Sequence, residues 1–145
     1  MKLRVDQLRE FIEPIVSACK SVKGFEKFNT EMLIEWWSAS IPAGIGFAYG
    51  AVVDEKPVGF LLGVNMVSPL SGEKEASEYL WAVLPEHRGG GTALKLLREF
   101  EEGAEKDGCA STIIGLSIFY KPDLLRAKYL RLGYEPVIES FKKRI

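Results

Sequence analysis

Residues 78–100, EYLWAVLPEHRGGGTALKLLREF, constrain the fold most, because they combine signals for a strand, a glycine turn and a helix. Residues 78–84 are rich in aromatic, branched and other apolar side chains. Pro85 ends this run, since proline has no N–H with which to extend a ladder. Beyond three glycines, apolar residues recur at helical spacing. The segment therefore predicts a strand that passes into a helix whose first turn is almost bare backbone.

The predicted turn has the properties of an anion-binding site. The first turn of a helix leaves N–H groups without partners and carries roughly half a positive charge from the helix dipole. Gly89, Gly90 and Gly91 let the backbone approach a ligand closely and point successive N–H groups into one concavity, as in phosphate-binding loops. Arg88 adds a permanent positive charge. The turn therefore predicts binding of a diphosphate.

Two motifs at this turn carry a family resemblance. Arg88, Gly91 and Ala93 match the pattern R/Q-x-x-G-x-G/A, and the sequence VLPEHR that ends at Arg88 matches V-x-P-x-x-R. This region resembles the acetyl-coenzyme A site of the GNAT-family N-acetyltransferases. The resemblance implies that acetyl-coenzyme A is the co-substrate and that its diphosphate binds residues 88–93, with Thr92 among them.

A second match to the family lies near the C-terminus, where Tyr129, Gly133 and Tyr134 fit Y-x-x-x-G-F/Y. The resemblance implies that the Tyr129 hydroxyl faces the coenzyme sulfur and that the pantetheine arm pairs with the backbone of Ala82 and Val83. A hydroxyl with a pKa near 10 can donate a proton to the thiolate that leaves when an amine attacks a thioester. Packing of Tyr129 against the sheet is the alternative.

The acceptor amine needs a base, because a lysine-like amine with a pKa of about 10.4 is almost wholly protonated near neutral pH. Glu78 is the candidate, acting directly or through water, although a glutamate at a strand start can also serve solubility. Glu75, Glu86 and His87 are further candidates, and the resemblance places His87 in the turn that faces the phosphates. The sequence has no second histidine, so we expect no metal site.

Composition limits the class of protein. The 145 residues match the size of one domain, and 47% apolar residues suffice for one core, so we expect a single domain over residues 1–145. With 19 basic and 20 acidic residues the charges nearly cancel, which argues against nucleic acid or an anionic membrane as partner.

Apolar runs are too short to span a bilayer, and the charged N-terminus does not resemble a signal peptide. We therefore expect a cytoplasmic protein in which Cys19 and Cys109 are reduced thiols.

The remaining patterns predict the order of elements. An edge strand over residues 1–5 is followed by a helix that Asp6 caps and that Pro14 kinks or splits. The later segments are a helix capped by Asn29 or Thr30, a hairpin over 45–67, a loop over 68–76, a strand over 112–118 buried on both faces, a helix that begins at Pro122, and a strand over 137–145.

This order predicts a mixed α/β (α+β) fold with a partly antiparallel sheet flanked by helices. It is similar to the GNAT fold, whose central sheet is largely antiparallel. Twelve residues follow Gly133, where that family has room for two strands. We therefore expect that the last strand is missing or that a partner subunit supplies it, which would make the protein a homodimer.

The sequence supports three hypotheses of function. The first is an N-acetyltransferase that moves an acetyl group from acetyl-coenzyme A to a primary amine of a small molecule or a protein. Direct attack is favoured, because neither cysteine lies in a motif for a covalent acyl-enzyme. The second is a catalytically silent GNAT-fold module that binds coenzyme A or another protein. The third, a glycine-loop nucleotide binder, is disfavoured because the motif is R-x-x-G-x-A and no acidic metal ligand follows a second strand. The absence of G-x-x-x-x-G-K-[ST] also excludes a nucleotidase P-loop.

Overall fold

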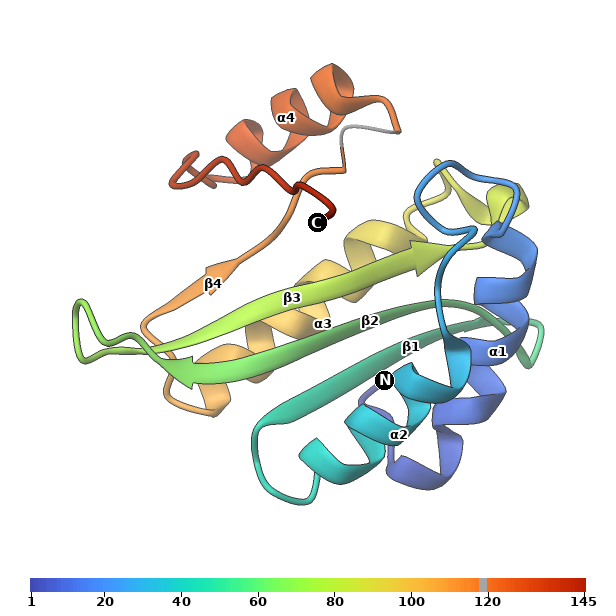
Figure 1. The fold of residues 1–145 in the computed structure, drawn as a ribbon, viewed down its shortest axis with the longest axis horizontal. Coiled ribbons are helices and arrows are strands. Elements are labelled where there is room, and N and C mark those ends of the chain that lie inside the picture. The colour runs from blue at the N-terminus through green and yellow to red at the C-terminus, as the bar shows by residue number, and fades with distance from the viewer. Residues whose placement is uncertain (118–119) are drawn as a thin grey trace. The chain divides into compact units, whose positions relative to one another are not determined.

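The computed structural model describes residues 1–117 and 120–145, which form two compact units, Met1–Gly115 and Leu116–Ile145 (Figure 1). The first unit contains the sheet, three α-helices and two 3-10 turns: Val5–Gln7, α1 (Leu8–Cys19), α2 (Thr30–Ser40), β1 (Gly46–Val53), β2 (Lys56–Val67), β3 (Lys74–Val83), Pro85–His87, α3 (Thr92–Lys106) and β4 (Ser111–Ile113). The second unit contains α4 (Pro122–Arg131). The single domain expected over residues 1–145 stays a prediction, since compact units can fold together or separately.

The strands are hydrogen-bonded in the order β1-β2-β3-β4, with the first two pairs antiparallel and β3 parallel to β4. The β1–β2 turn is tight: Asp54 and Glu55 have φ of 50° and 66° between the paired residues Val53 and Lys56. Those dihedrals suit the two-residue hairpin turns that match the twist of the strands. The predicted mixed fold, with a largely antiparallel sheet between helices, is confirmed.

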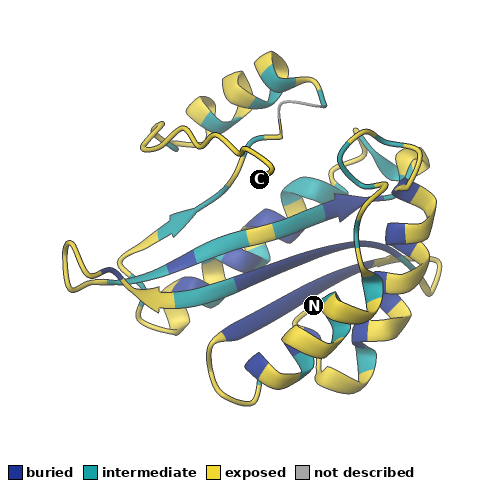
Figure 2. Cartoon of the chain, viewed as in Figure 1, coloured by how far each residue is buried: buried dark blue, intermediate teal, exposed yellow. Residues whose placement is uncertain are grey.

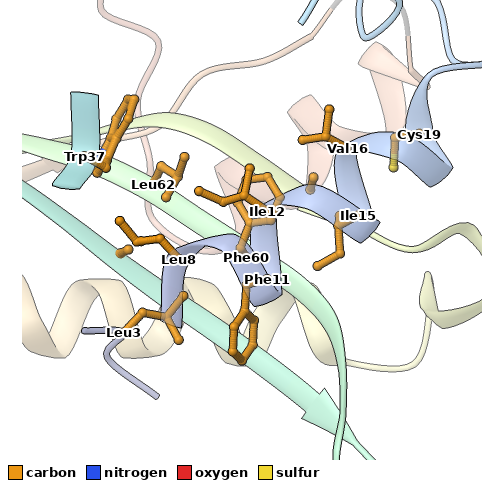
Figure 3. Packing of buried hydrophobic residues seen from close by; sticks show 12 residues of the cluster. Leu3, Leu8, Phe11, Ile12, Ile15, Val16, Cys19, Trp37, Phe60 and Leu62 are labelled. Carbon is orange, nitrogen blue, oxygen red and sulfur yellow. The ribbon is translucent and has the colours of Figure 1, made fainter. Parts of the chain in front are cut away.

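The sheet is covered on both faces. Figure 3 shows the apolar side chains of α1 packed against Phe60 and Leu62 of β2. On the opposite face, the ring of Phe47 stacks on Phe100 of α3, with centroids 5.3 Å apart. Much of β1 and β2 is therefore buried (Figure 2). Each buried Leu or Phe side chain stabilises the folded state by about 1.5–3 kcal/mol, because folding removes its apolar surface from water.

The predicted helix ends are only partly correct. Asn29 caps α2, since its side chain accepts from the Met32 N–H at 3.1 Å. Asp6 does not cap α1, because it lies inside a 3-10 turn and its carboxylate pairs with Arg4 at 3.0 Å. Pro14 does not split α1. Buried apolar neighbours on that helix oppose the roughly 3 kcal/mol that an interior proline costs.

Three strand predictions need correction. Strand β3 begins at Lys74, inside the loop expected over 68–76, because the ladder with β2 extends to Val67 and buries Ala76. Strand β4 ends at Ile113 and is half-buried to exposed, because its ladder with β3 has three positions; Ile118, in the predicted strand, lies outside the described residues.

The third correction concerns residues 137–145, which form no strand in the structure. A strand needs a hydrogen-bonded neighbour. No backbone hydrogen bond recorded for the described residues involves this segment. The expectation that the last strand is missing, or that a partner subunit supplies it, stays a prediction. Among residues 1–117 and 120–145, the helices are too short or too polar to cross a membrane.

We predict that Gly63→Ala destabilises the protein by about 1–3 kcal/mol, the usual cost of overpacking a core. A Cβ at Gly63 would lie 2.2 Å from Cζ of Phe47 and 2.6 Å from the backbone oxygen of Ser77, which cannot rotate away. Gly90→Ala is the matched control, because its Cβ would meet only the His87 oxygen at 3.9 Å. Urea denaturation measures both variants. Equal stability of the two variants would contradict the packing argument.

Candidate active site

The site begins where β3 and β4 part. Their parallel ladder pairs Glu75 with Ser111 and ends at the pair Ser77 and Ile113. The C-terminal half of β3, residues 78–83, therefore has β2 on one side, and no strand of residues 1–117 or 120–145 pairs with its other side (Figure 1). An edge of this kind presents backbone N–H and C=O groups that need partners.

The direction of the backbone shows which groups face this open edge. The Leu84 N–H donates to the Val58 oxygen at 2.8 Å, so Leu84 points its backbone at β2. Because backbone groups alternate along a strand, those of Ala82 also face β2, whereas those of Trp81 and Val83 face the open edge. Of the two residues expected to pair with a pantetheine arm, Val83 lies on the appropriate side. Sequence reasoning missed Trp81, because the side of β3 that its backbone faces follows from the register with β2, which the structure supplies.

A bulge in β3 sets the position of Glu78. Leu62 pairs with Leu80, but Gly63 pairs with Glu78, so Tyr79 is the extra residue. The Tyr79 ring lies 5.2 Å from the Trp37 ring of α2. The carboxylate of Glu78 instead lies at the parting strands, where its Oε2 accepts the Gly115 N–H at 2.9 Å.

The electrostatic surroundings of Glu78 suit proton transfer. Burial raises the pKa of the Glu78 carboxyl to about 7, and the hydrogen bond from Gly115 opposes that rise. A carboxyl that titrates near neutral pH can take up and release a proton under physiological conditions. A perturbed carboxyl beside an open strand edge is also typical of a functional site.

The glycine turn at the start of α3 is open to a ligand. Gly89 and Gly91 have φ of 83° and 88°, a region that side-chain-bearing residues rarely adopt. A Cβ added at either glycine would meet no atom within 4 Å. Gly91 is the N-cap and provides no side-chain cap, so the N–H groups of Thr92 and Ala93 lie in the uncapped first turn. The turn therefore has room for the diphosphate expected there, since a Cβ at Gly89 or Gly91 would meet no atom of the described residues.

Arg88 makes contacts that the sequence did not suggest. Its Nε donates to the Val83 oxygen at 3.0 Å, and its Nη2 lies 3.7 Å from Sγ of Cys19. Arg88 therefore ties the end of β3 to the end of α1. Its role as a phosphate ligand stays a prediction. Cys19 and Cys109 are both free thiols, and burial raises the pKa of the Cys19 thiol.

The predicted catalytic residues belong to different units of the chain. Tyr129 belongs to α4 of the second unit, where its ring centroid lies 6.3 Å from that of Tyr134. Its approach to a coenzyme sulfur stays a prediction. Glu86 and His87 lie in the 3-10 turn before the glycines, and Glu75 lies in the β3–β4 ladder, where it pairs with Ser111. No three metal-ligating side chains gather in the part of the chain that the structure describes.

Solved structures share this fold over the whole chain. The chain matches a ribosomal-protein-alanine N-acetyltransferase from Brucella melitensis biovar Abortus 2308 with 21% identity and a TM-score of 0.76, covering 100% of this chain and 96% of that one. An aminoglycoside acetyltransferase from an uncultured soil metagenomic sample, in complex with sisomicin, matches with 18% identity, a TM-score of 0.77 and coverage of 100% and 94%. A possible acetyltransferase from Clostridium difficile 630 matches with 16% identity, a TM-score of 0.74 and coverage of 100% and 95%.

The search of curated proteins finds no match. The model of the Acetyltransferase (GNAT) family matches residues 7–134, which is most of the 145 residues. The match includes the open glycine turn, the edge of β3 and the helix that carries Tyr129. The chain therefore belongs to the GNAT family of acetyltransferases.

Proposed function

We propose that this chain transfers an acetyl group from acetyl-coenzyme A to a primary amine of a small molecule or a protein. The observation that carries the proposal is that one strand, β3, leads from a carboxyl with a pKa of about 7 at Glu78 to an open anion-binding turn at Gly91. A coenzyme bound along this strand would bring a thioester to a base. Membership of the acetyltransferase family supports the same reaction.

The turn and the end of β3 bind different parts of the coenzyme. The backbone N–H groups of Gly89, Gly90 and Gly91, with those of Thr92 and Ala93 in the first turn of α3, bind the diphosphate. The backbone of Val83, joined by Trp81, pairs with the amides of the pantetheine arm. Arg88 acts here through its bond to the Val83 oxygen, which fixes the end of the strand, and adds positive charge near the turn.

Glu78 and Tyr129 handle the protons. Glu78, directly or through water, takes one proton from the acceptor ammonium, and the neutral amine then attacks the thioester carbonyl. The N–C bond forms and the C–S bond breaks, while the Tyr129 hydroxyl gives its proton to the leaving thiolate. The acylated nitrogen returns its second proton to the tyrosine, and Glu78 releases its proton to solvent. The amine loses two protons in all, of which one remains on the coenzyme thiol.

The acceptor is proposed only as a class. Two of the similar structures are a ribosomal-protein-alanine N-acetyltransferase and an aminoglycoside acetyltransferase, and both names imply an acceptor with an amine. Within the segments 21–30 and 68–76, residues 21–29 and 68–73 connect the helices and strands of the first unit and are exposed or half-buried apart from Ser68, so they are the segments that would set acceptor specificity.

We predict that Gly90→Glu weakens binding of acetyl-coenzyme A about tenfold, because a carboxylate beside the diphosphate costs about 1–2 kcal/mol in a site that is open to water. Gly90 has an ordinary φ and open space around its Cβ, so the side chain fits without strain. Gly90→Gln is the control, with similar size and no charge. Titration calorimetry measures both affinities. Equal affinities for the two variants would show that the diphosphate does not bind at this turn.

We predict that Tyr129→Phe lowers kcat by about 10–100-fold, within the usual range for loss of a general acid, and leaves the affinity for acetyl-coenzyme A unchanged. The measurement is release of free thiol with a panel of amines, together with calorimetry. Tyr134→Phe is the matched control from the same unit. An unchanged kcat would remove Tyr129 from the reaction. A wild-type protein that binds the coenzyme without turnover would favour the silent module.

We predict that kcat/KM rises with pH through about 7, because Glu78 must be ionised to accept a proton and its pKa lies there. Below that pH the protonated carboxyl cannot act as a base. Glu78→Gln should lower kcat/KM and remove this acidic limb. If kcat/KM of Glu78→Gln still rises with pH through about 7, a group other than Glu78 causes that rise.

A further inference from the structure

We infer that the backbone N–H of Gly115 is a positioning group for Glu78: it holds Oε2 of the carboxylate and leaves Oε1 to take the proton of the acceptor amine. This inference rests on the proposed function, because it assigns a partner to the proposed base. The bond spans the gap between the parting strands, from the chain just beyond β4 to β3, over 2.9 Å.

The register of the two strands explains why a side chain fills this position. The pairs Ser77 with Ile113 and their predecessors have a constant offset, so a continued ladder would set Gly115 opposite Tyr79. The ladder ends before that point, and the N–H of Gly115 bonds to the carboxylate instead. The side chain thus provides an acceptor for an N–H that the parting of the strands would otherwise leave without one. It does so where the open edge of β3 begins.

Glycine at position 115 favours this close contact. A Cβ at position 115 would lie 3.3 Å from Oε2 of Glu78, tighter than an ordinary contact between a Cβ and an oxygen. A larger residue would push the carboxylate and the main chain apart by a few tenths of an ångström. The main chain at Gly115 can therefore approach the carboxylate as a side-chain-bearing residue could not.

The electrostatics point the same way. Burial raises the pKa of Glu78 and the Gly115 N–H lowers it, and no charged side chain among the described residues contributes to the shift. This hydrogen bond is therefore the interaction that opposes desolvation of the carboxylate. It lowers the pKa of the base and directs its second oxygen, in the way that an orienting group acts on the base of a catalytic pair.

The test is Gly115→Pro, which removes the N–H, because proline has none. The residue before a proline prefers an extended conformation, which suits the chain that leads out of β4. Leu116→Pro is the matched control, since it places proline in the same segment and keeps the Gly115 N–H. The pKa of Glu78 is measured by carbon-13 NMR of protein labelled at its glutamate carboxyls, with Glu78→Gln to identify the resonance. We expect Gly115→Pro to raise this pKa by about one unit, a tenfold change in acid dissociation.

Leu116→Pro should leave the pKa of Glu78 unchanged. The acidic limb of kcat/KM should move upward with the pKa in Gly115→Pro alone. An unchanged pKa in Gly115→Pro, or an equal rise in both proline variants, would overturn the inference. Full activity of Glu78→Gln would instead overturn the proposed base, and the NMR result for Gly115 would still stand. The two failures are therefore distinguishable.

A second measurement does not depend on proline being tolerated. Hydrogen exchange of the Gly115 amide is compared in wild type, Glu78→Gln and Glu78→Ala. The glutamine amide oxygen can accept the same N–H, whereas alanine cannot. We expect protection of the amide to fall several-fold in Glu78→Ala and to remain in Glu78→Gln. Equal protection in all three proteins would show that Glu78 does not hold this N–H and would overturn the inference.

Discussion

The site depends on the point at which β3 and β4 stop pairing. A parallel ladder that continued past Ser77 and Ile113 would use the backbone groups of β3 and leave no edge for a ligand. Parting the strands has a cost, because each exposed or half-buried N–H and C=O needs another partner. The protein meets this need with side chains: Glu78 accepts the Gly115 N–H, and Arg88 donates to the Val83 oxygen. The two ends of the open edge are thus stabilised by charged groups that also belong to the candidate site.

The glycine turn and the open edge are parts of one arrangement. Strand β3 passes through a short 3-10 turn into Gly89 and Gly91, whose positive φ brings the bare first turn of α3 next to the strand end. Helix α3 is anchored by buried apolar residues against β1 and β2, so its dipole is held in a fixed direction relative to β3. The bond network of Arg88 adds α1 to this frame through Cys19. Packing on both faces of the sheet therefore fixes the position of the glycine turn relative to the carboxylate.

Local signals in the sequence predicted local structure well. Asn29 caps α2 because an asparagine side chain can accept an N–H within one turn, whatever the rest of the chain does. Gly108 ends α3 with φ of 76° and a pair of backbone bonds typical of helix ends, from Gly108 to the Glu105 oxygen and from Cys109 to the Ala104 oxygen. The same approach was wrong for β4 and for residues 137–145, since apolar content does not create a strand without a neighbour to pair with.

Residues 78–100 alone were enough to predict a strand, a glycine turn and a helix, with Glu78 on the strand and Arg88 at the turn. These follow from the conformational limits of proline and glycine and from helical periodicity, which act over a few residues. Only the tertiary structure decided that Arg88 turns back to Val83 and Cys19, that Trp81 faces the open edge, and that the Gly115 N–H meets Glu78. The pKa of about 7 at Glu78 also depends on the tertiary structure. Each depends on strand register, a bulge and burial among residues far apart in the chain, and a sequence pattern contains none of these.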